Sequence, residues 1–432
     1  MPVGSGLATQ FGVAEETITN EVQRLSGTPS ATFTLTFEGA TTTSLATNAS
    51  AAAIVAALEA LPNIGTGGVT ATGGPLPTAV DITFVGPLVA GRDVGALTIQ
   101  SGITGLTQST QTAGKGYGDT NTPNRFYEIE SESLALEIDQ VENFGLRAGN
   151  AYQRADRRRQ GLRRGGGQVE LAVHSKGFGL ILKHIFGKAA VITTPAGGTT
   201  SRDQTFTLGD GWNIGMMPQV GRPDAQSDSG NVNPYNYRGG KVVEAEFKLS
   251  VGELLMCTLV LDVRDEEEST ALATASYASA TKILDWLGST VKIAGAPVDV
   301  QDVTLKIARK VKDDRFFHGS NLKRQPILND AFDVTLELET EFIDPALYRR
   351  FSQEPSSLPS ATWQIDGDVI EAITGGNANF GLLWTIPNVV TTGDTPGSDG
   401  PDVLGQKLVM RAVHDGTNEL ITCRYRSTDG AS

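Results

Sequence analysis

The sequence has few of the residues and motifs that mark enzymes and membrane proteins. Its 432 residues include only four histidines and two cysteines, and aromatic residues make up 6%. No histidine pair has an HExxH or other metal-ligand spacing, and no Walker A, GxGxxG or GxSxG motif is present. No stretch approaches the roughly 18 to 20 apolar residues that span a bilayer, and the chain does not open with a basic segment followed by an apolar one. We therefore expect no catalytic site, cofactor, metal or membrane, and a chain that folds in a cytosol.

The cysteines, tryptophans and acidic runs predict structural roles. Cys257 and Cys423 lie inside the apolar runs ELLMCTLVL and ELITCRY, which predicts two buried free thiols rather than a disulfide. The four tryptophans lie near expected strands or helices, so core packing explains them better than an aromatic-lined sugar cleft does. The run RDEEES, residues 264–269, lacks the spacing of a calcium loop and predicts a solvated strand end.

Glycine and small residues dominate what is present. Glycine accounts for 50 residues, and hydrophobic residues make up 39% of the chain. This composition is typical of many short strands joined by turns, so we expect a mainly β (α+β) protein. A chain of this length is long enough for two or three domains, each with a core of its own.

The second half of the chain repeats the pattern of the first. An alternating strand followed by a short amphipathic helix occurs at residues 167–187 and again at 332–353. Near the end of each half, the paired-strand runs 239–263 and 404–427 align at an offset of 166 residues, which places Glu253, Leu254, Leu255 and Cys257 on Glu419, Leu420, Ile421 and Cys423. We predict two copies of one β-rich module, at residues 118–270 and 275–432.

Strand alternation predicts that each module is a sandwich of half-buried sheets. Leu134, Leu136 and Ile138 alternate with Glu137 and Asp139, as in an antiparallel strand with one face toward a core and one toward water. The water-facing positions of other expected strands are acidic as well, at Glu170, Glu244, Glu246, Glu337 and Glu339.

A separate small domain is predicted before the first module. Residues 31–112 contain short strands and one helix that begins near Asn48 or Ser50, both good N-caps. Tracts rich in threonine, glycine and proline flank this segment and mark it as an inserted α+β domain. Residues 1–30 are then an N-terminal arm.

The basic residues are concentrated in two corresponding loops. Residues 154–164 carry six arginines and one aspartate, a net charge of +5, and residues 309–324 carry a net +4. Subtracting these nine charges from the net charge of −14 leaves −23 on the rest of the chain. The sequence therefore predicts acidic sheets and basic loops.

Three interpretations of the arginine run are open: contact with a second copy of the chain, a solvated loop, and nucleic-acid binding. A nucleic-acid-binding protein is expected to carry a basic folded surface with aromatic or amide groups for the bases, whereas the sheets here are acidic. Ordering a loop costs about 1 to 2 kcal/mol per residue, so a loop of this length needs a binding partner to stay extended. An acidic surface of a second copy is the partner we favour, through a contact of two different patches that builds rings or open stacks.

Four segments of the chain resemble the tail tube (major tail) proteins of long-tailed, non-contractile bacteriophages. They are GLATQFGVAEET (6–17), NRFYEIESESLALEIDQVENFGLRAG (124–149), GFGLILKH (177–184) and GGKVVEAEF (239–247). The resemblance covers residues 6–22 and 118–265, and the second repeat fits the same module more loosely. The segments FTLTFEG and NASAAAIVAALEALPNIGTGGVTATGG resemble a small decoration-type module found in many phage structural proteins.

The resemblance implies a structural virion protein whose rings stack into the tail tube through which DNA leaves the capsid. Two modules per chain imply a trimeric, pseudo-sixfold ring, with a hexamer as the alternative, and a large inner β-barrel of roughly 24 strands. The long loop of the family reaches the adjacent ring, which implies ring-to-ring contacts for Arg154, Arg157, Arg158, Arg159, Arg163, Arg164, Arg309, Lys310, Lys312, Arg315, Lys323 and Arg324. A negatively charged lumen would let DNA slide, and strand alternation assigns to it Glu137, Asp139, Glu170, Glu337 and Glu339.

The implied partners are other copies of the chain, a tape-measure protein inside the tube, and tail terminator and distal tail proteins at its ends. DNA would pass through without specific binding, and the protein would be assembled in the host cytoplasm and become part of the virion. Two other classes stay open: a β-rich surface-layer or adhesin-type assembly protein, and an enzyme on a β-sandwich.

Overall fold

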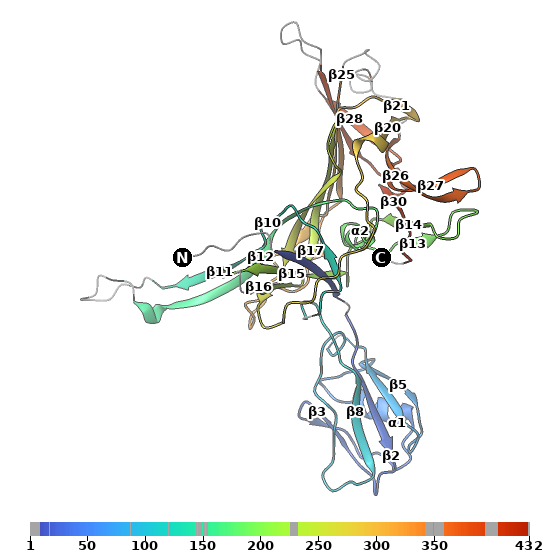
Figure 1. Ribbon diagram of the computed structural model, residues 1–432. Helices are drawn as coiled ribbons and strands as arrows, with labels where there is room; N and C mark the ends of the chain where they lie inside the picture. The colour runs from blue at the N-terminus through green and yellow to red at the C-terminus, as the bar shows by residue number, and fades with distance from the viewer. Residues whose placement is uncertain are drawn as a thin grey trace. The chain divides into compact units, whose positions relative to one another are not determined.

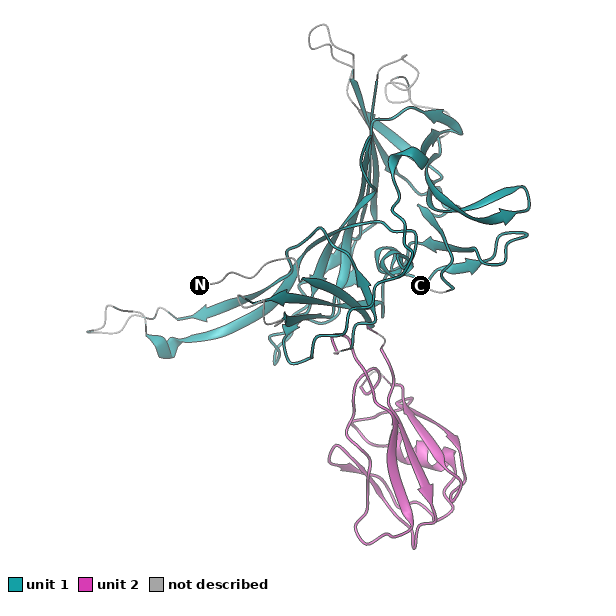
Figure 2. Cartoon of the chain, in the orientation of Figure 1, with its two compact units in different colours: residues 1–15, 120–432 teal, residues 16–119 magenta. Residues whose placement is uncertain are grey.

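The computed structural model describes residues 9–430 except 17, 87, 120, 144, 146–148, 150, 151, 153, 225–231, 342–348, 350–357 and 394–404. The chain divides into two compact units, Met1–Glu15 with Thr120–Ser432 (unit 1) and Glu16–Asp119 (unit 2), coloured separately in Figure 2. The fold is mainly β, with antiparallel sheets and two α-helices in the described part of the chain, which confirms the expected class.

Unit 2 is built on a four-stranded sheet in the order β5-β6-β2-β8 and one helix. Ser50 caps the helix through its hydroxyl, which accepts a hydrogen bond from Ala53 N at 3.2 Å, as its sequence position predicts. The unit begins before the expected residues 31–112, because β2, which lies in the expected N-terminal arm, is an inner strand of this sheet. Its elements are β2 (Val22–Gly27), β3 (Leu35–Phe37), β4 (Ala40–Thr41), α1 (Ala51–Glu59), β5 (Val69–Gly73), β6 (Val80–Phe84), β7 (Thr98–Ile99) and β8 (Leu106–Thr112).

The centre of unit 1 is one large antiparallel sheet to which both halves of the chain contribute. The first half supplies β10 (Ser131–Glu132), β11 (Ala135–Glu142), β12 (Arg158–Ala172), β17 (Lys241–Ser250) and β18 (Met256–Val263). The second half supplies β22 (Asp302–Ala308), β25 (Asp333–Glu341), β28 (Val389–Gly393) and β29 (Gly405–Ala412). The order is β11-β12-β18-β17-β22-β25-β29-β28, with β10 also on β12, and the halves join where β17 pairs with β22. The sheet is open, with β11 and β28 at its two edges.

Two further sheets and a helix cover the apolar face of the large sheet. The sheet of the first half contains β1 (Gln10–Glu16), β9 (Arg125–Tyr127), β15 (Gly215–Pro223), β16 (Val232–Arg238) and β19 (Asp265–Glu267). The other contains β13 (Val191–Thr193), β14 (Arg202–Thr207), β20 (Ser289–Ile293), β21 (Ala296–Val298), β26 (Ala361–Ile373), β27 (Gly376–Ile386) and β30 (Thr422–Ser427). Phe247 of the large sheet packs on Trp384 of the second, with ring centroids 5.0 Å apart, so one core joins the layers as expected for sandwiches.

Helix α2 (Gly179–Phe186) follows β12 directly and packs into this core. Its last turn ends at Gly187, whose φ of 67° is left-handed, and a side chain there would collide with the guanidinium of Arg309. The second expected helix, at the end of 332–353, lies mostly outside the described residues.

The two halves have the same strand order. In the large sheet, β11-β12-β18-β17 corresponds to β22-β25-β29-β28, and in the covering sheets, β19-β16-β15-β1-β9 corresponds to β30-β27-β26-β20-β21. This correspondence corrects the alignment at an offset of 166. Cys257 lies in β18 of the large sheet and Cys423 in β30 of a covering sheet, whereas the counterpart of β18 is β29. Strands with the same alternation look alike in sequence, so the offset matched β17 and β18 to the strands that follow their counterparts in the chain, β29 and β30. The match of residues 167–187 with 332–353 joins the true counterparts β12 and β25.

Candidate assembly surface

The polar face of the large sheet is an acidic surface with partial charge compensation. In-register pairs place Glu170, Glu244, Glu246, Asp302, Glu337 and Glu339 on one face. The opposite, apolar face contains Leu171, Phe247, Leu305 and Leu338, which are buried. The alternation read from the sequence is therefore that of the structure. The structure adds Asp302 to this face, a residue at a strand end, where the sequence pattern is too short to assign a side.

Lysines on neighbouring strands pair with some of these carboxylates. Lys306 of β22 lies 2.6 Å from Glu244 of β17, and Lys407 of β29 lies 2.7 Å from Glu337 of β25. Each pair raises the pKa of its lysine through a side-chain hydrogen bond, so both lysines stay charged at neutral pH. Glu170 accepts a hydrogen bond from the Ser131 hydroxyl at 3.2 Å. In the described part of the chain, Glu170, Glu246, Asp302 and Glu339 lie in no ion pair, so the face keeps an excess of negative charge.

The arginine run lies mainly in a strand and only partly in a loop. Arg158, Arg159, Arg163 and Arg164 belong to β12, which pairs with β11 from Gly166 to Arg158. Together the two strands form a hairpin, here called the arm, that extends away from the large sheet (Figure 1). Arg154 precedes the 3-10 turn η2 (Ala155–Arg157) at its far end. The run was expected to be a loop because its polar residues break the apolar alternation, but cross-strand pairing here involves polar partners.

Acidic residues of the arm itself neutralise several of its arginines. Arg158 lies 3.3 Å from Glu142, Arg164 lies 3.3 Å from Asp139, and Arg154 forms a two-point contact with Asp156. Glu137 and Asp139, expected in a lumen, thus lie on the arm near its root, with Glu137 in register with Arg164. Asp265 of β19 forms ion pairs with both Arg163 and Arg238. The pair with Arg163 attaches the root of the arm to β19.

The second basic loop folds back onto the first half of the chain. Lys323 and Asp262 form a buried ion pair, and Arg163 N donates to Asn321 O at 3.0 Å. Arg309 is also buried and donates to the carbonyl oxygens of His184 and Ile185 at the end of α2. Arg309 and Lys323 are therefore unavailable to a neighbouring ring, which corrects their expected role. The remaining basic residues of this loop lie at the surface or near it: Lys310, Lys312, Arg315 and Arg324. The Arg315 side chain donates to Gln325 O, and the two lysines lie within ion-pair distance of Asp333 and Asp314.

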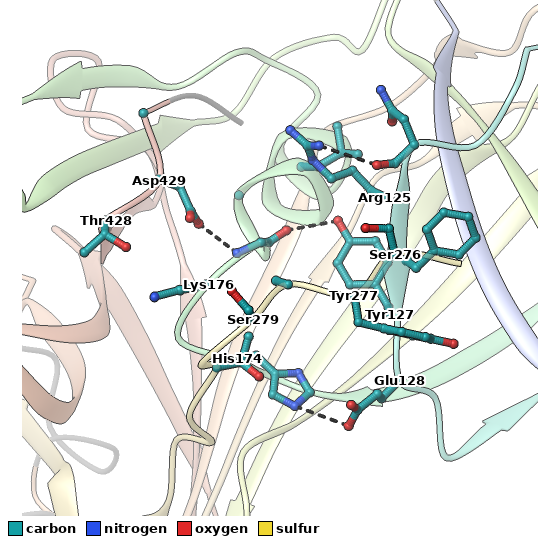
Figure 3. A pocket seen from close by; sticks show the side chains of 18 residues that line it. Arg125, Tyr127, Glu128, His174, Lys176, Ser276, Tyr277, Ser279, Thr428 and Asp429 are labelled. Atoms are coloured by element: carbon teal, nitrogen blue, oxygen red, sulfur yellow. Dashed lines mark hydrogen bonds and ion pairs between the residues drawn. The ribbon is translucent and has the colours of Figure 1, made fainter. Parts of the chain in front are cut away.

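A cavity of about 570 Å³ lies between the two halves, where β9, the start of α2, the linker 276–281 and residues 428–430 meet (Figure 3). Asp429 accepts a hydrogen bond from Gly177 N at 2.7 Å, and the Tyr127 hydroxyl donates to Gly177 O at 3.0 Å. His174 lies 3.9 Å from Glu128. These contacts hold the start of α2 and the C-terminal segment in place. Across the described residues, no group of three or more His, Cys, Asp or Glu side chains could hold a metal ion.

None of the helices in the described residues is long and apolar enough to cross a membrane. Cys257 and Cys423 are buried free thiols, and burial raises the pKa of both. The fold thus combines an open sheet with an acidic face, a projecting arm and the same strand order in both halves, as in a β-rich structural protein.

The family follows from comparison with known proteins. The family model described as phage tail tube protein matches residues 108–412. The chain therefore belongs to the phage tail tube proteins, a structural family whose members assemble into the tube of the phage tail and are components of the virion. This confirms the resemblance of the sequence to tail tube proteins. Among curated proteins, no relative matches the chain.

Proposed function

We propose that this chain forms closed rings by pairing β28 of one copy with β11 of the next, and that these rings stack into the tube. The observation that carries the proposal is the junction inside the chain. There β17, the last strand of the first half of the sheet, pairs with β22, the first strand of the second half, over seven residue pairs. Because β28 and β11 are the counterparts of β17 and β22, the same junction can form between copies. Pairing would also remove two exposed sheet edges.

Three copies would close the ring in this proposal. Each copy contributes the two four-stranded halves, residues 118–270 and 275–432, which we treat as the two modules of a duplicated chain. Three copies then give a barrel of roughly 24 strands, wide enough to leave a broad channel. A hexamer of whole chains is the alternative, and the mass of the ring distinguishes the two.

The acidic face of the large sheet would line this channel. Cationic groups bind DNA phosphates and release counterions, which would hold the genome in place, whereas a negatively charged wall repels the phosphates. Glu170, Glu337 and Glu339 lie on this face and support that role, while Glu137 and Asp139 belong to the arm root. Unit 2 would decorate the outside of the tube. A tape-measure protein in the lumen, terminator and distal tail proteins at the ends, and assembly in the host cytoplasm complete the proposal.

Disulfide trapping tests the ring. Val390 and Thr392 of β28 are in register with Arg411 and Val409 of β29, and Val409 is in register with Glu337 of β25. Val390 and Thr392 therefore lie on the same face of the sheet as Glu337. On β11, Ala135 and Glu137 share this side. Chains with one cysteine at 390 or 392 and one at 135 or 137 should oxidise to a product that stops at three chains on a non-reducing gel.

The matched control carries cysteine at Thr391, which faces the opposite side of β28, with cysteine at Glu137. It should cross-link poorly, since the two side chains would lie on opposite faces of the joined sheet. Negative-stain microscopy of the same samples should show rings with a threefold outline. Six-chain products would favour the hexamer, and a monomer in every combination would refute edge pairing.

A further inference from the structure

The arm and an apolar groove lie at opposite ends of the large sheet. The strands β12, β17 and β25 run in the same direction and begin at the same end of the large sheet, and the arm extends from this end. The groove lies at the other end, where β17 ends at Ser250 and β22 begins at Asp302. Each copy has one arm and one groove, so a contact between them joins two different patches and repeats along the strand direction. Such a contact builds an open stack.

The groove has an apolar floor and an exposed apolar rim. Its volume is about 290 Å³, and Leu249, Val291 and Val303, which line it, are buried. At the rim, Val251 is 63% exposed and Trp286 is 36% exposed, and Leu287 next to Trp286 is 77% exposed. Apolar side chains gathered at this exposure are typical of a contact surface.

One carboxylate, that of Asp299, lines the groove, and three more lie at the same end of the sheet. The carbonyl oxygen of Asp299 accepts a hydrogen bond from the Thr340 hydroxyl at 2.6 Å. Gln301, also in the lining, donates through its backbone to Glu339 O at 2.8 Å and through its side chain to Glu341 at 3.2 Å. These contacts bring the carboxylates of Asp299, Glu339 and Glu341 to the same end of the sheet, where Asp302 pairs in register with Glu339. Within the described residues, no cation forms an ion pair with any of the four.

The arm offers the complementary set of side chains. Val141 is 63% exposed and lies directly opposite Arg159 in the hairpin, so the two share one face of the arm. Arg157 is the last residue of the turn η2 and directly precedes β12. Its carbonyl oxygen accepts a hydrogen bond from Asn143 N at 3.1 Å, which continues the pairing of the hairpin. Arg158, on the other face, is occupied by Glu142 and by Gln140. In the described residues, neither Arg157 nor Arg159 lies in an ion pair, unlike Arg154, Arg158, Arg163 and Arg164.

We propose that the arm of one copy docks into the groove of a second copy in the next ring, with Val141 against Val251 and Leu287, and with Arg159 and Arg157 on the carboxylates of Asp299 and Glu341. This inference rests on the proposed ring, which sets the two copies one above the other. It identifies the acidic surface that receives the arginines as the groove rim at the end of the sheet. Of the carboxylates at this end, Asp302 and Glu339 belong to the acidic face that would line the channel, whereas Asp299 lines the groove.

Charge reversal tests the docking. The variant Arg159→Asp should raise the protein concentration needed for stacking about tenfold, as expected for the loss of one close charge pair at an interface. Adding Asp299→Arg to Arg159→Asp should restore stacking, because the pair is re-formed with exchanged signs. The matched control is Arg158→Asp on the other face of the arm, which should stack like the unmodified protein. Sedimentation measures the stacked fraction, and the mass of the unstacked particle shows whether rings persist.

The outcomes separate this inference from the proposed ring. Rings that form but stack equally well with Arg159→Asp would overturn the docking and leave the ring intact. A photo-reactive amino acid at Val141 gives a second measurement that needs no ring. In a mixture of two isotope-labelled populations, it should cross-link to Val251, Trp286 or Leu287 of the other population. Cross-links between copies that map only to other surfaces would refute the groove as the acceptor.

Discussion

Arg309 in the second half of the chain donates a hydrogen bond of 2.8 Å to Ile185 O at the end of helix α2 in the first half. The guanidinium is buried, and burial lowers the pKa of Arg309 to about 10, so the side chain remains charged at neutral pH. A cation at this position also interacts favourably with the negative end of the helix dipole. The bond ties the two halves into one core.

Removing this side chain should destabilise unit 1. We expect Arg309→Ala to lower the free energy of unfolding by about 2 to 4 kcal/mol, because it leaves a cavity and helix carbonyls without donors. Urea denaturation followed by tryptophan fluorescence measures the change. The control Lys310→Ala removes an exposed side chain 3.9 Å from Asp333 and should cost less than about 1 kcal/mol. Equal effects of the two substitutions would contradict the structural role of Arg309.

Asp262 should make stability depend on pH. Burial raises the pKa of its carboxyl to about 6 and outweighs the attraction of Lys323. The folded state therefore binds a proton more tightly than the unfolded state, whose carboxyl has a pKa near 3.8. Stability from this group is fully present below about pH 4 and is lost as the pH rises through 6, by about 3 kcal/mol in total. Denaturation of the protein and of Asp262→Asn between pH 4 and 7 measures this, and identical slopes would refute the assignment.

Glu371 of β26 should order the loop that follows β13. Its carboxylate accepts hydrogen bonds from the backbone N–H groups of Thr199, Thr200 and Ser201 and from the hydroxyls of Thr199 and Ser201. These hydrogen bonds lower the pKa of Glu371, and the bond from the Ser201 hydroxyl has the largest effect. The carboxylate therefore stays ionised at neutral pH.

We expect Glu371→Gln to speed amide hydrogen exchange at residues 199–201, since a neutral amide oxygen replaces the charged acceptor. The control Asp368→Asn, on the same hairpin, changes an exposed carboxylate 3.8 Å from Lys282 and should leave exchange in this loop unchanged. Unaltered exchange with Glu371→Gln would show that the loop is held by other contacts.

The two thiols should be inert in the folded protein. Cys257 and Cys423 are fully buried, and the raised pKa of each thiol keeps it protonated. A thiol reagent should label neither cysteine at neutral pH in buffer and both in denaturant. Labelling of Cys423 alone in buffer would indicate that the covering sheet of the second half opens while the large sheet stays closed.

The strands of the large sheet were predictable because their alternation is strong. Val169, Leu305 and Leu338 each stand between polar residues, and a period of two assigns opposite faces without knowledge of the partners. The correspondence between Cys257 and Cys423 was wrong for the same reason, since period and burial do not distinguish a strand from its neighbour. The arginine run was expected to be a loop because β12 continues beyond the core, where cross-strand bonds to β11 replace apolar burial.

The amino-acid sequence was enough to establish a mainly β chain with a repeated pattern, acidic sheet faces and the family to which it belongs, because these properties depend on local alternation, composition and short motifs. Tertiary structure alone revealed that Arg309 and Lys323 are internal, that the halves share one sheet through β17 and β22, and that the groove and the arm lie at opposite ends of it. Each of these results depends on contacts between residues far apart in the chain. A charged residue looks the same in the sequence whether it meets water, a distant carbonyl group or another copy.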